Sequence, residues 1–164
     1  MRHGPAEDHS KTGRDEDREL THVGRVRVRG VAGWLVKEGE LPSRILTSRL
    51  VRAAETAEIV ASSMARRGPM EVEVVGELAP GPNALELVRR LQIAADTSTM
   101  GDAPMIVGHE PDLSGLVDRL LGESMPVGMD KAMVVCLELD GEKATLRFIL
   151  DPKSLDLVED HRGA

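Results

Sequence analysis

The sequence is poor in residues that cross-link a chain or stack against bases. Cys136 is the single cysteine among 164 residues, so no internal disulfide can form and a reducing compartment is expected. Trp34 and Phe148 are the only Trp, Phe or Tyr residues, which argues against a stacking surface for nucleic-acid bases and requires an aliphatic core. No long apolar run resembles a signal peptide or a membrane span. These absences predict a cytoplasmic protein without a membrane partner.

An excess of positive charge is also missing. The chain carries 21 Lys and Arg against 28 Asp and Glu, a formal net charge of -7, which argues against a general affinity for nucleic acid. Any anion site must therefore be a local basic pocket. Hydrophobic residues make up 41% and charged residues 30%, as in folded rather than disordered proteins. Because no linker or composition break divides the chain, we expect a single domain over residues 1–164.

Apolar periodicity alternates between strands and helices along the chain. It predicts helices at residues 21–39, 50–66, 83–95 and 111–121, and strands at 42–48, 71–75 and 104–107. Asp140-Gly141 is a hairpin signal between two further strands, at 132–139 and 143–150. This order predicts a three-layer α/β/α domain with a mainly parallel central sheet and a C-terminal antiparallel hairpin.

Two loops of the predicted sheet carry candidate site residues, because ligands collect at the carboxyl ends of parallel strands. Arg52 lies one turn into the helix that follows the first loop, where its guanidinium could reach a phosphate. His109 directly follows the strand at 104–107 and could donate to a phosphoryl oxygen or transfer a proton. An isolated arginine is more often a surface cation, and an isolated histidine such as His109 could simply hydrogen-bond its own turn.

The amino end brings together a cation, a nucleophile and a flexible backbone in Arg2-His3-Gly4. Arg2 could bind a phosphate that His3 attacks, while Gly4 lets the backbone approach closely. A tripeptide alone is a weak signal, and it could equally be part of a frayed terminus.

The pieces together resemble the histidine phosphatase superfamily, and most closely its small bacterial branch of SixA-type phosphohistidine phosphatases. The resemblance rests on Arg2-His3-Gly4, on Ser48 with Arg52-Ala53 and Thr56, and on Gly108-His109, in this order; supporting segments are Asp17 to Thr21, Glu77-Leu78 with Pro80-Gly81, and Val107 to Ser114. It implies a phosphoglycerate-mutase-like fold and a phosphatase that needs neither a metal nor another cofactor. His3 would be the nucleophile, forming a phosphohistidine that water hydrolyses, and Arg2, Gly4, Arg52 and His109 would bind the phosphate.

The resemblance also implies the substrate class, a phosphohistidine on a protein such as a signalling or phosphotransfer partner. Two alternatives stay open: a phosphatase of a small phosphorylated metabolite, and a module that binds phosphate or a phosphoprotein without turnover. A metal site built from His3, His9, His22 and His109 is weaker, because their spacings match no common ligand motif.

The chain departs from the family pattern in three places. In relatives an apolar strand precedes the Arg-His-Gly segment, whereas only Met1 precedes it here, so we expect that the natural chain starts upstream or that another segment substitutes. Arg49 stands where many relatives have proline. The general acid has no clear match; Glu77 is the tentative candidate, and a solvated carboxylate is the alternative for it. The charge run from Asp15 to Glu19 is interpreted as a solvated loop.

Overall fold

Three short parallel strands form the sheet that carries the predicted loops. The computed structural model describes residues 1–81, 84–95, 103–140 and 143–158. The strands are ordered β2-β1-β3, with bounds Val72–Val74, Ile45–Thr47 and Met105–Val107. Ile45 pairs with Val72 on one side and with Met105 on the other, both in parallel. Carboxyl ends of β1 and β3 therefore lie side by side, as the sequence predicts.

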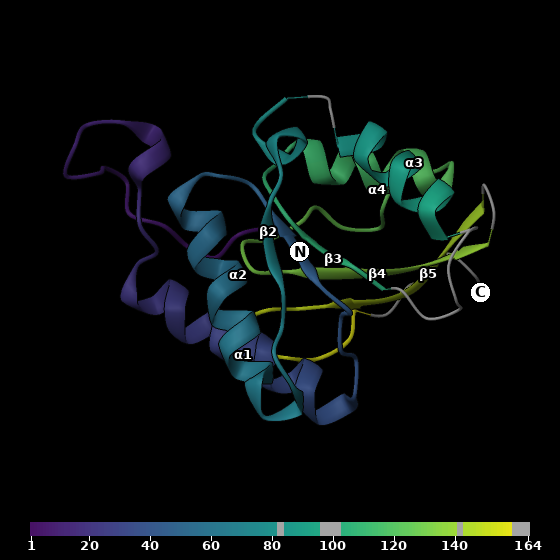
Figure 1. Cartoon of the computed structure of the whole chain (residues 1–164), viewed down its shortest axis with the longest axis horizontal. Helices are drawn as coiled ribbons and strands as arrows, with labels where there is room; N and C mark the ends of the chain where they lie inside the picture. The colour runs from purple at the N-terminus through teal and green to yellow at the C-terminus, as the bar shows by residue number, and fades with distance from the viewer. Residues whose placement is uncertain (82–83, 96–102, 141–142, 159–164) are drawn as a thin grey trace.

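Helices cover both faces of this sheet, as Figure 1 shows. Their bounds are α1 His22–Glu38, α2 Val51–Met64, α3 Ala84–Ala95 and α4 Asp112–Leu121. The alternation within β1 explains the layers: Ile45 packs in the core with α1 and α2, whereas Leu46 packs in a second cluster with α3 and α4. The structure thus confirms the α/β architecture with helices on both faces.

The longest helix, α1, begins and ends where the sequence predicts. The hydroxyl of Thr21 accepts a hydrogen bond from the Gly24 amide at 2.9 Å, which satisfies one free amide of the first turn. Gly39 ends the helix in a left-handed conformation, with φ of 77°. The apolar stripe is narrower than the sequence suggests, because Val23 and Val26 are exposed on the solvent side.

The C-terminal hairpin is confirmed, and it stands apart from the parallel sheet. β4 (Val134–Asp140) pairs antiparallel with β5 (Lys143–Leu150), and the predicted turn residue Gly141 lies outside the described residues. Short 3-10 helices η1, η2 and η3 occupy Asp15–Asp17, Ala65–Arg67 and Gly76–Leu78. Within the described ranges, no helix is long and apolar enough to cross a membrane.

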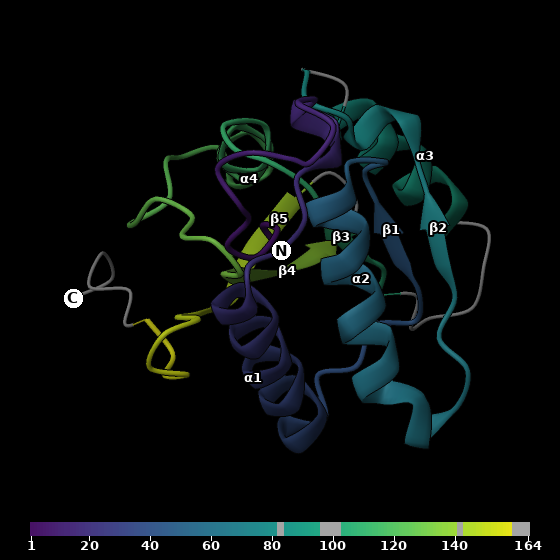
Figure 2. The same cartoon turned by 90° about the vertical axis from the view of Figure 1, so that its left-hand side faces the viewer.

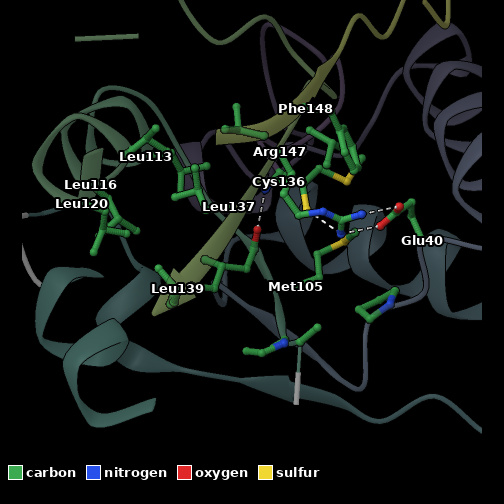
Figure 3. Close-up of a pocket in the computed structure, with 18 of the residues that line it drawn as sticks. Glu40, Met105, Leu113, Leu116, Leu120, Cys136, Leu137, Leu139, Arg147 and Phe148 are labelled. Atoms are coloured by element: carbon green, nitrogen blue, oxygen red, sulfur yellow. Dashed lines mark hydrogen bonds and ion pairs between the residues drawn. The ribbon is translucent and has the colours of Figure 1, made fainter. Parts of the chain in front are cut away.

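A cleft of about 410 Å³ separates β3 from β4 (Figure 3). Its walls are apolar, with Ile106 of β3 and Val134 of β4 among the lining residues, and Arg147 donates to both carboxylate oxygens of Glu40 at its rim, at 2.9 and 3.0 Å. Met1 closes one end: its amine donates to the Ile106 carbonyl at 2.7 Å, and burial lowers the pKa of that amine to about 5. The cleft is therefore lined by the edges of β3 and β4 and by Met1 at the start of the chain.

The position of this cleft gives the first prediction. An apolar extension of about five residues before Met1 would fit one strand between the two edges and replace the buried amine with an amide. We expect such an extension to raise Tm by several degrees in a thermal unfolding experiment. A Gly-Ser extension of equal length is the control, and an equal effect of both extensions would contradict the prediction. The strand expected before Arg2 stays a prediction.

Gly24 allows α1 to pack against the segment that follows His3. A Cβ at this position would collide with the carbonyl oxygen of Pro5, which is backbone and cannot move aside cheaply. We expect Gly24→Ala to lower the free energy of unfolding by at least about 2 kcal/mol in urea denaturation. Gly33→Ala is the matched control on the same helix, since a Cβ there meets nothing within 4 Å; it should stabilise by about 0.5–1 kcal/mol. Equal effects of the two changes would refute the collision.

Candidate active site

Four sequence-predicted residues converge at the carboxyl ends of β1 and β3. Arg2 and His3 lie beside the end of β3, because Arg2 bridges to Gly108 in parallel and the His3 amide donates to the Gly108 carbonyl at 3.1 Å. Arg52 comes from the first turn of α2, and His109 from the loop between β3 and α4. The rings of His3 and His109 have centroids 5.1 Å apart. Residues separated by up to 107 positions thus form one cluster.

His3 is held as a neutral base with a defined free nitrogen. Its side chain is buried, and its Nδ1 lies 2.7 Å from the Gly4 carbonyl oxygen. Since a carbonyl only accepts, Nδ1 carries the proton and Nε2 keeps its lone pair. Desolvation is the largest influence on the ring and, with the nearby charge of Arg52, lowers the pKa of His3 to about 3 despite the opposing bond to Gly4. His3 is therefore neutral at physiological pH, with the lone pair of Nε2 available for a base or a nucleophile.

Position 4 has no room for a side chain, and the Gly4 amide links the amino end of the chain to α2. A Cβ here would lie 2.7 Å from Val28 Cγ2, too close for a side chain. Its amide donates to the Thr56 hydroxyl oxygen at 3.0 Å, and that hydroxyl donates to the Arg52 carbonyl at 2.7 Å. Thr56 therefore ties the segment of the candidate nucleophile to the helix that carries Arg52.

Arg52 is a buried cation with only part of its hydrogen-bonding capacity used. Its Nη1 donates to the Asp15 carbonyl at 2.8 Å and its Nη2 to the Asp15 carboxylate at 3.0 Å. The loop that carries η1 therefore lies against the amino end of α2 (Figure 2). Ser48 binds the main chain just before the amino end of α2, since its Oγ accepts a hydrogen bond from the Leu50 amide at 3.2 Å.

Several buried polar atoms of the cluster have no partner among the described residues. They are Nε of Arg2, Nε of Arg52 and both ring nitrogens of His109. Arg2 uses its Nη1 on the Met129 carbonyl at 2.6 Å, which fixes its side chain without satisfying Nε. Buried polar groups without partners are costly, and such groups around one point are typical of a ligand site. An anion with several acceptor oxygens would satisfy them.

His109 is neutral for the same physical reason as His3. Desolvation is the largest influence, and with the adjacent Arg52 it lowers the pKa of His109 to about 4 although Asp112 and Asp15 oppose this. A neutral imidazole has one N–H, so His109 can donate one hydrogen bond to a phosphoryl oxygen. The permanent positive charge of the cluster comes from Arg2 and Arg52 alone.

The remaining predicted residues lie at the margin or outside the cluster. Glu77 is in η3, partly buried, and its role as general acid stays a prediction. His9 is exposed on the loop before η1, and His22 is exposed at the start of α1. In the described part of the chain, no group of three or more His, Cys, Asp or Glu side chains is placed to hold a metal ion.

Asp15 was missed by sequence reasoning, which treated its charge run as a solvated loop. The ion pair with Arg52 joins residues 37 positions apart, and no periodicity signals such a contact. A pairing of the acidic run with a buried cation could be suspected only once Arg52 was known to be buried.

Comparison with known families agrees with this geometry. The model of the histidine phosphatase superfamily (branch 1) matches residues 1–81, which include Arg2, His3, Gly4 and Arg52. The chain belongs to the histidine phosphatase superfamily. An uncharacterised protein of Picosynechococcus sp. is 39% identical over 116 residues, a match that spans 69% of this chain and 66% of that protein.

Solved structures of this superfamily resemble the whole chain. The protein histidine phosphatase SixA in complex with tungstate has a TM-score of 0.82 at 27% identity, covering 95% of this chain and 97% of that one. A structure from Agrobacterium tumefaciens, described as a phosphohistidine phosphatase SixA, has a TM-score of 0.76 at 24% identity. The match covers 93% of this chain and 95% of that one. The α-ribazole phosphatase of Shigella flexneri shares the fold, with a TM-score of 0.65 at 19% identity and coverage of 90% and 92%.

The neutral state of the two site histidines predicts a loss of stability in acid. In the unfolded chain, imidazoles bind protons below about pH 6.5, whereas folded His3 and His109 stay neutral down to about 3 and about 4. The unfolded state binds more protons in this window, so stability is full above pH 6.5 and is lost as the pH falls. From pH 7 to 5, His3 and His109 should each lower the free energy of unfolding by about 1–2 kcal/mol.

Urea denaturation in phosphate-free buffer measures this loss at each pH. His3→Gln should flatten the pH dependence, because glutamine does not titrate. His9→Gln is the control, since His9 is exposed and outside the cluster; it should leave the dependence unchanged. An unchanged slope in His3→Gln would show that His3 is not held neutral.

Proposed function

We propose that this protein is a phosphatase that removes the phosphoryl group from phosphohistidine on a partner protein, through a phosphohistidine intermediate at His3. The observation that carries the proposal is the convergence of a buried neutral His3 with two arginines and His109, whose unpartnered donors suit a tetrahedral oxyanion. Similarity to SixA, a protein histidine phosphatase solved with tungstate, supports the substrate class.

In the first step, the lone pair on His3 Nε2 attacks phosphorus. A phosphorus–nitrogen bond forms at His3 and the bond to the leaving group breaks, with its electron pair going to that group. The Nδ1 proton stays hydrogen-bonded to the Gly4 carbonyl, which stabilises the positive charge that the phosphorylated ring acquires.

The arginines and His109 stabilise charge on the phosphoryl oxygens. Charge spreads over three equatorial oxygens in such a transfer, and donors fixed in a dry pocket stabilise it more than water does. Arg2 is held in place by Met129 and Arg52 by Asp15, so both cations are positioned before the substrate binds. The proposed mechanism needs no metal ion, since the two guanidinium groups supply the positive charge.

In the second step, water attacks the phosphorus of phosphorylated His3. The phosphorus–nitrogen bond breaks, its electron pair returns to Nε2, and the water proton leaves to solvent or to a phosphate oxygen. His3 is regenerated in its neutral form, which its burial favours. Inorganic phosphate is the product.

A second function follows from the same chemistry. The α-ribazole phosphatase of Shigella flexneri has the same fold, so a small phosphorylated metabolite is the alternative substrate. An ester leaves as an alkoxide, which needs a proton donor such as Glu77, whereas a protonated imidazole needs none. This difference favours phosphohistidine, and the two substrates can be compared directly.

The test measures phosphate release from a histidine-phosphorylated protein and from small phosphate esters. We expect faster release from phosphohistidine and, after a rapid acid-free quench, phosphate bound covalently to the enzyme. His3→Ala should lower turnover by at least about a thousandfold while keeping phosphate binding, because the cations remain.

Each alternative has its own outcome in this test. Release from esters alone would refute the phosphohistidine substrate, and unchanged turnover in His3→Ala would exclude His3 as the nucleophile. Phosphate binding without any turnover would favour the binding module. A chelator should have no effect on the wild type, and a large loss would contradict the metal-free mechanism.

A further inference from the structure

Asp15 is bound directly to the candidate active site, and the proposed mechanism uses it only to position Arg52. Its carboxylate and its carbonyl both accept from the Arg52 guanidinium, at 3.0 and 2.8 Å. Arg18 Nε lies 2.8 Å from the other carboxylate oxygen. Even so, the Asp15 side chain is 67% exposed. One side of the carboxylate therefore contacts the site and the other faces solvent.

Asp15 is ionised and is not a proton donor. Desolvation opposes its ionisation, but the hydrogen bond and charge of Arg52, together with Arg18, outweigh it and lower the pKa of the carboxyl group. Its charge also acts on the His109 ring, which lies in the same cluster. A fixed negative charge thus stands beside the donors that would bind a phosphoryl group.

The position of Asp15 corresponds to the side of the leaving group. In an in-line transfer, the nucleophile and the leaving group lie on opposite sides of phosphorus. His3 is only 7% exposed, so a phosphoryl group carried by a protein must enter from solvent with its leaving group outward. Asp15 is held by Arg52 and its side chain is largely exposed, and from this we place it on that outward side.

We infer that Asp15 selects substrates whose leaving group is a protonated imidazole, an inference that rests on the proposed function. A phosphohistidine ring protonated on its free nitrogen is cationic, and the adjacent carboxylate favours this form. When His3 attacks, the electron pair of the breaking bond neutralises the ring, which departs as imidazole without a further proton. An ester oxygen instead gains negative charge on departure, which the carboxylate repels.

The experiment compares kcat/KM on two substrates, a phosphohistidine peptide and p-nitrophenyl phosphate. Asp15→Asn keeps the main-chain carbonyl and an amide oxygen that can accept from Arg52. It should lower the value for phosphohistidine more than the value for the ester, so that the preference falls about tenfold. Asp15→Glu, which keeps the charge, should restore most of the preference. Inhibition by inorganic phosphate should persist in both variants, since the phosphate donors are intact.

Asp17→Asn is the matched control, from the same 3-10 turn. The Asp17 carboxylate accepts from the Thr12 hydroxyl at 2.5 Å and is not bonded to Arg52. This change should leave the ratio of the two kcat/KM values as in the wild type. A drop equal to that of Asp15→Asn would assign the effect to the net charge of the loop rather than to Asp15, and would overturn the inference.

Other outcomes separate this inference from the proposed function. An equal loss on both substrates in Asp15→Asn would mean that Asp15 only positions Arg52, and no change would mean that it has no part; either result overturns the inference and leaves the phosphatase intact. A wild type that releases no phosphate from the phosphohistidine peptide would refute the proposed function and the inference together.

Discussion

The candidate site depends on how three residues at the amino end are bound by backbone. Residues 1–3 lie between the end of β3 and the start of β4, and four hydrogen bonds hold them: Gly108 N to Met1 O, His3 N to Gly108 O, Arg2 N to Met133 O and Ala132 N to His3 O, all 3.0–3.2 Å. Because the main chain places His3, its ring needs only the Gly4 carbonyl to fix its tautomer. The position of His3 is thus set by hydrogen bonds of the main chain, so that little side-chain entropy is lost in ordering it.

The site combines residues that must be charged with residues that must be neutral. Burial near two cations disfavours a charged imidazole, so His3 and His109 are neutral. Arginine keeps its charge under the same conditions, because its guanidinium does not lose its proton in proteins. Lysine in place of Arg52 would be more easily neutralised by burial. The same low-dielectric pocket therefore leaves the lone pair of His3 Nε2 free and keeps the positive charge of the arginines.

Most elements could be predicted from the sequence, because local signals agree with the fold. Thr21 and Gly39 bracket α1, and short apolar runs mark β1 and β3. The wrong expectation concerned the width of the α1 stripe: Val23 and Val26 fit the helical period but face solvent. Periodicity gives the apolar face of a helix, whereas the part of it that is covered depends on neighbours far away in the sequence.

What escaped prediction is long-range and polar. The bond between Asp15 and Arg52 depends on a loop returning over α2, and the cleft depends on a gap between two strand edges. Neither has a local pattern, because both are set by how elements meet. The grouping of His3, Arg52 and His109 was predictable only through the rule that carboxyl ends of parallel strands share one edge, combined with the resemblance to a known family.

Arg52 and Thr56 show why their spacing matters. Four positions apart on α2, they lie on one helix face, so the Thr56 hydroxyl can donate to the Arg52 carbonyl while accepting from the Gly4 amide. On its side chain, Arg52 uses its two Nη groups for Asp15, and its Nε has no partner among the described residues. Arg52 thereby joins the segment of the candidate nucleophile to the η1 loop. Lysine, with one ammonium group, could not replace a planar fork that serves two partners at once.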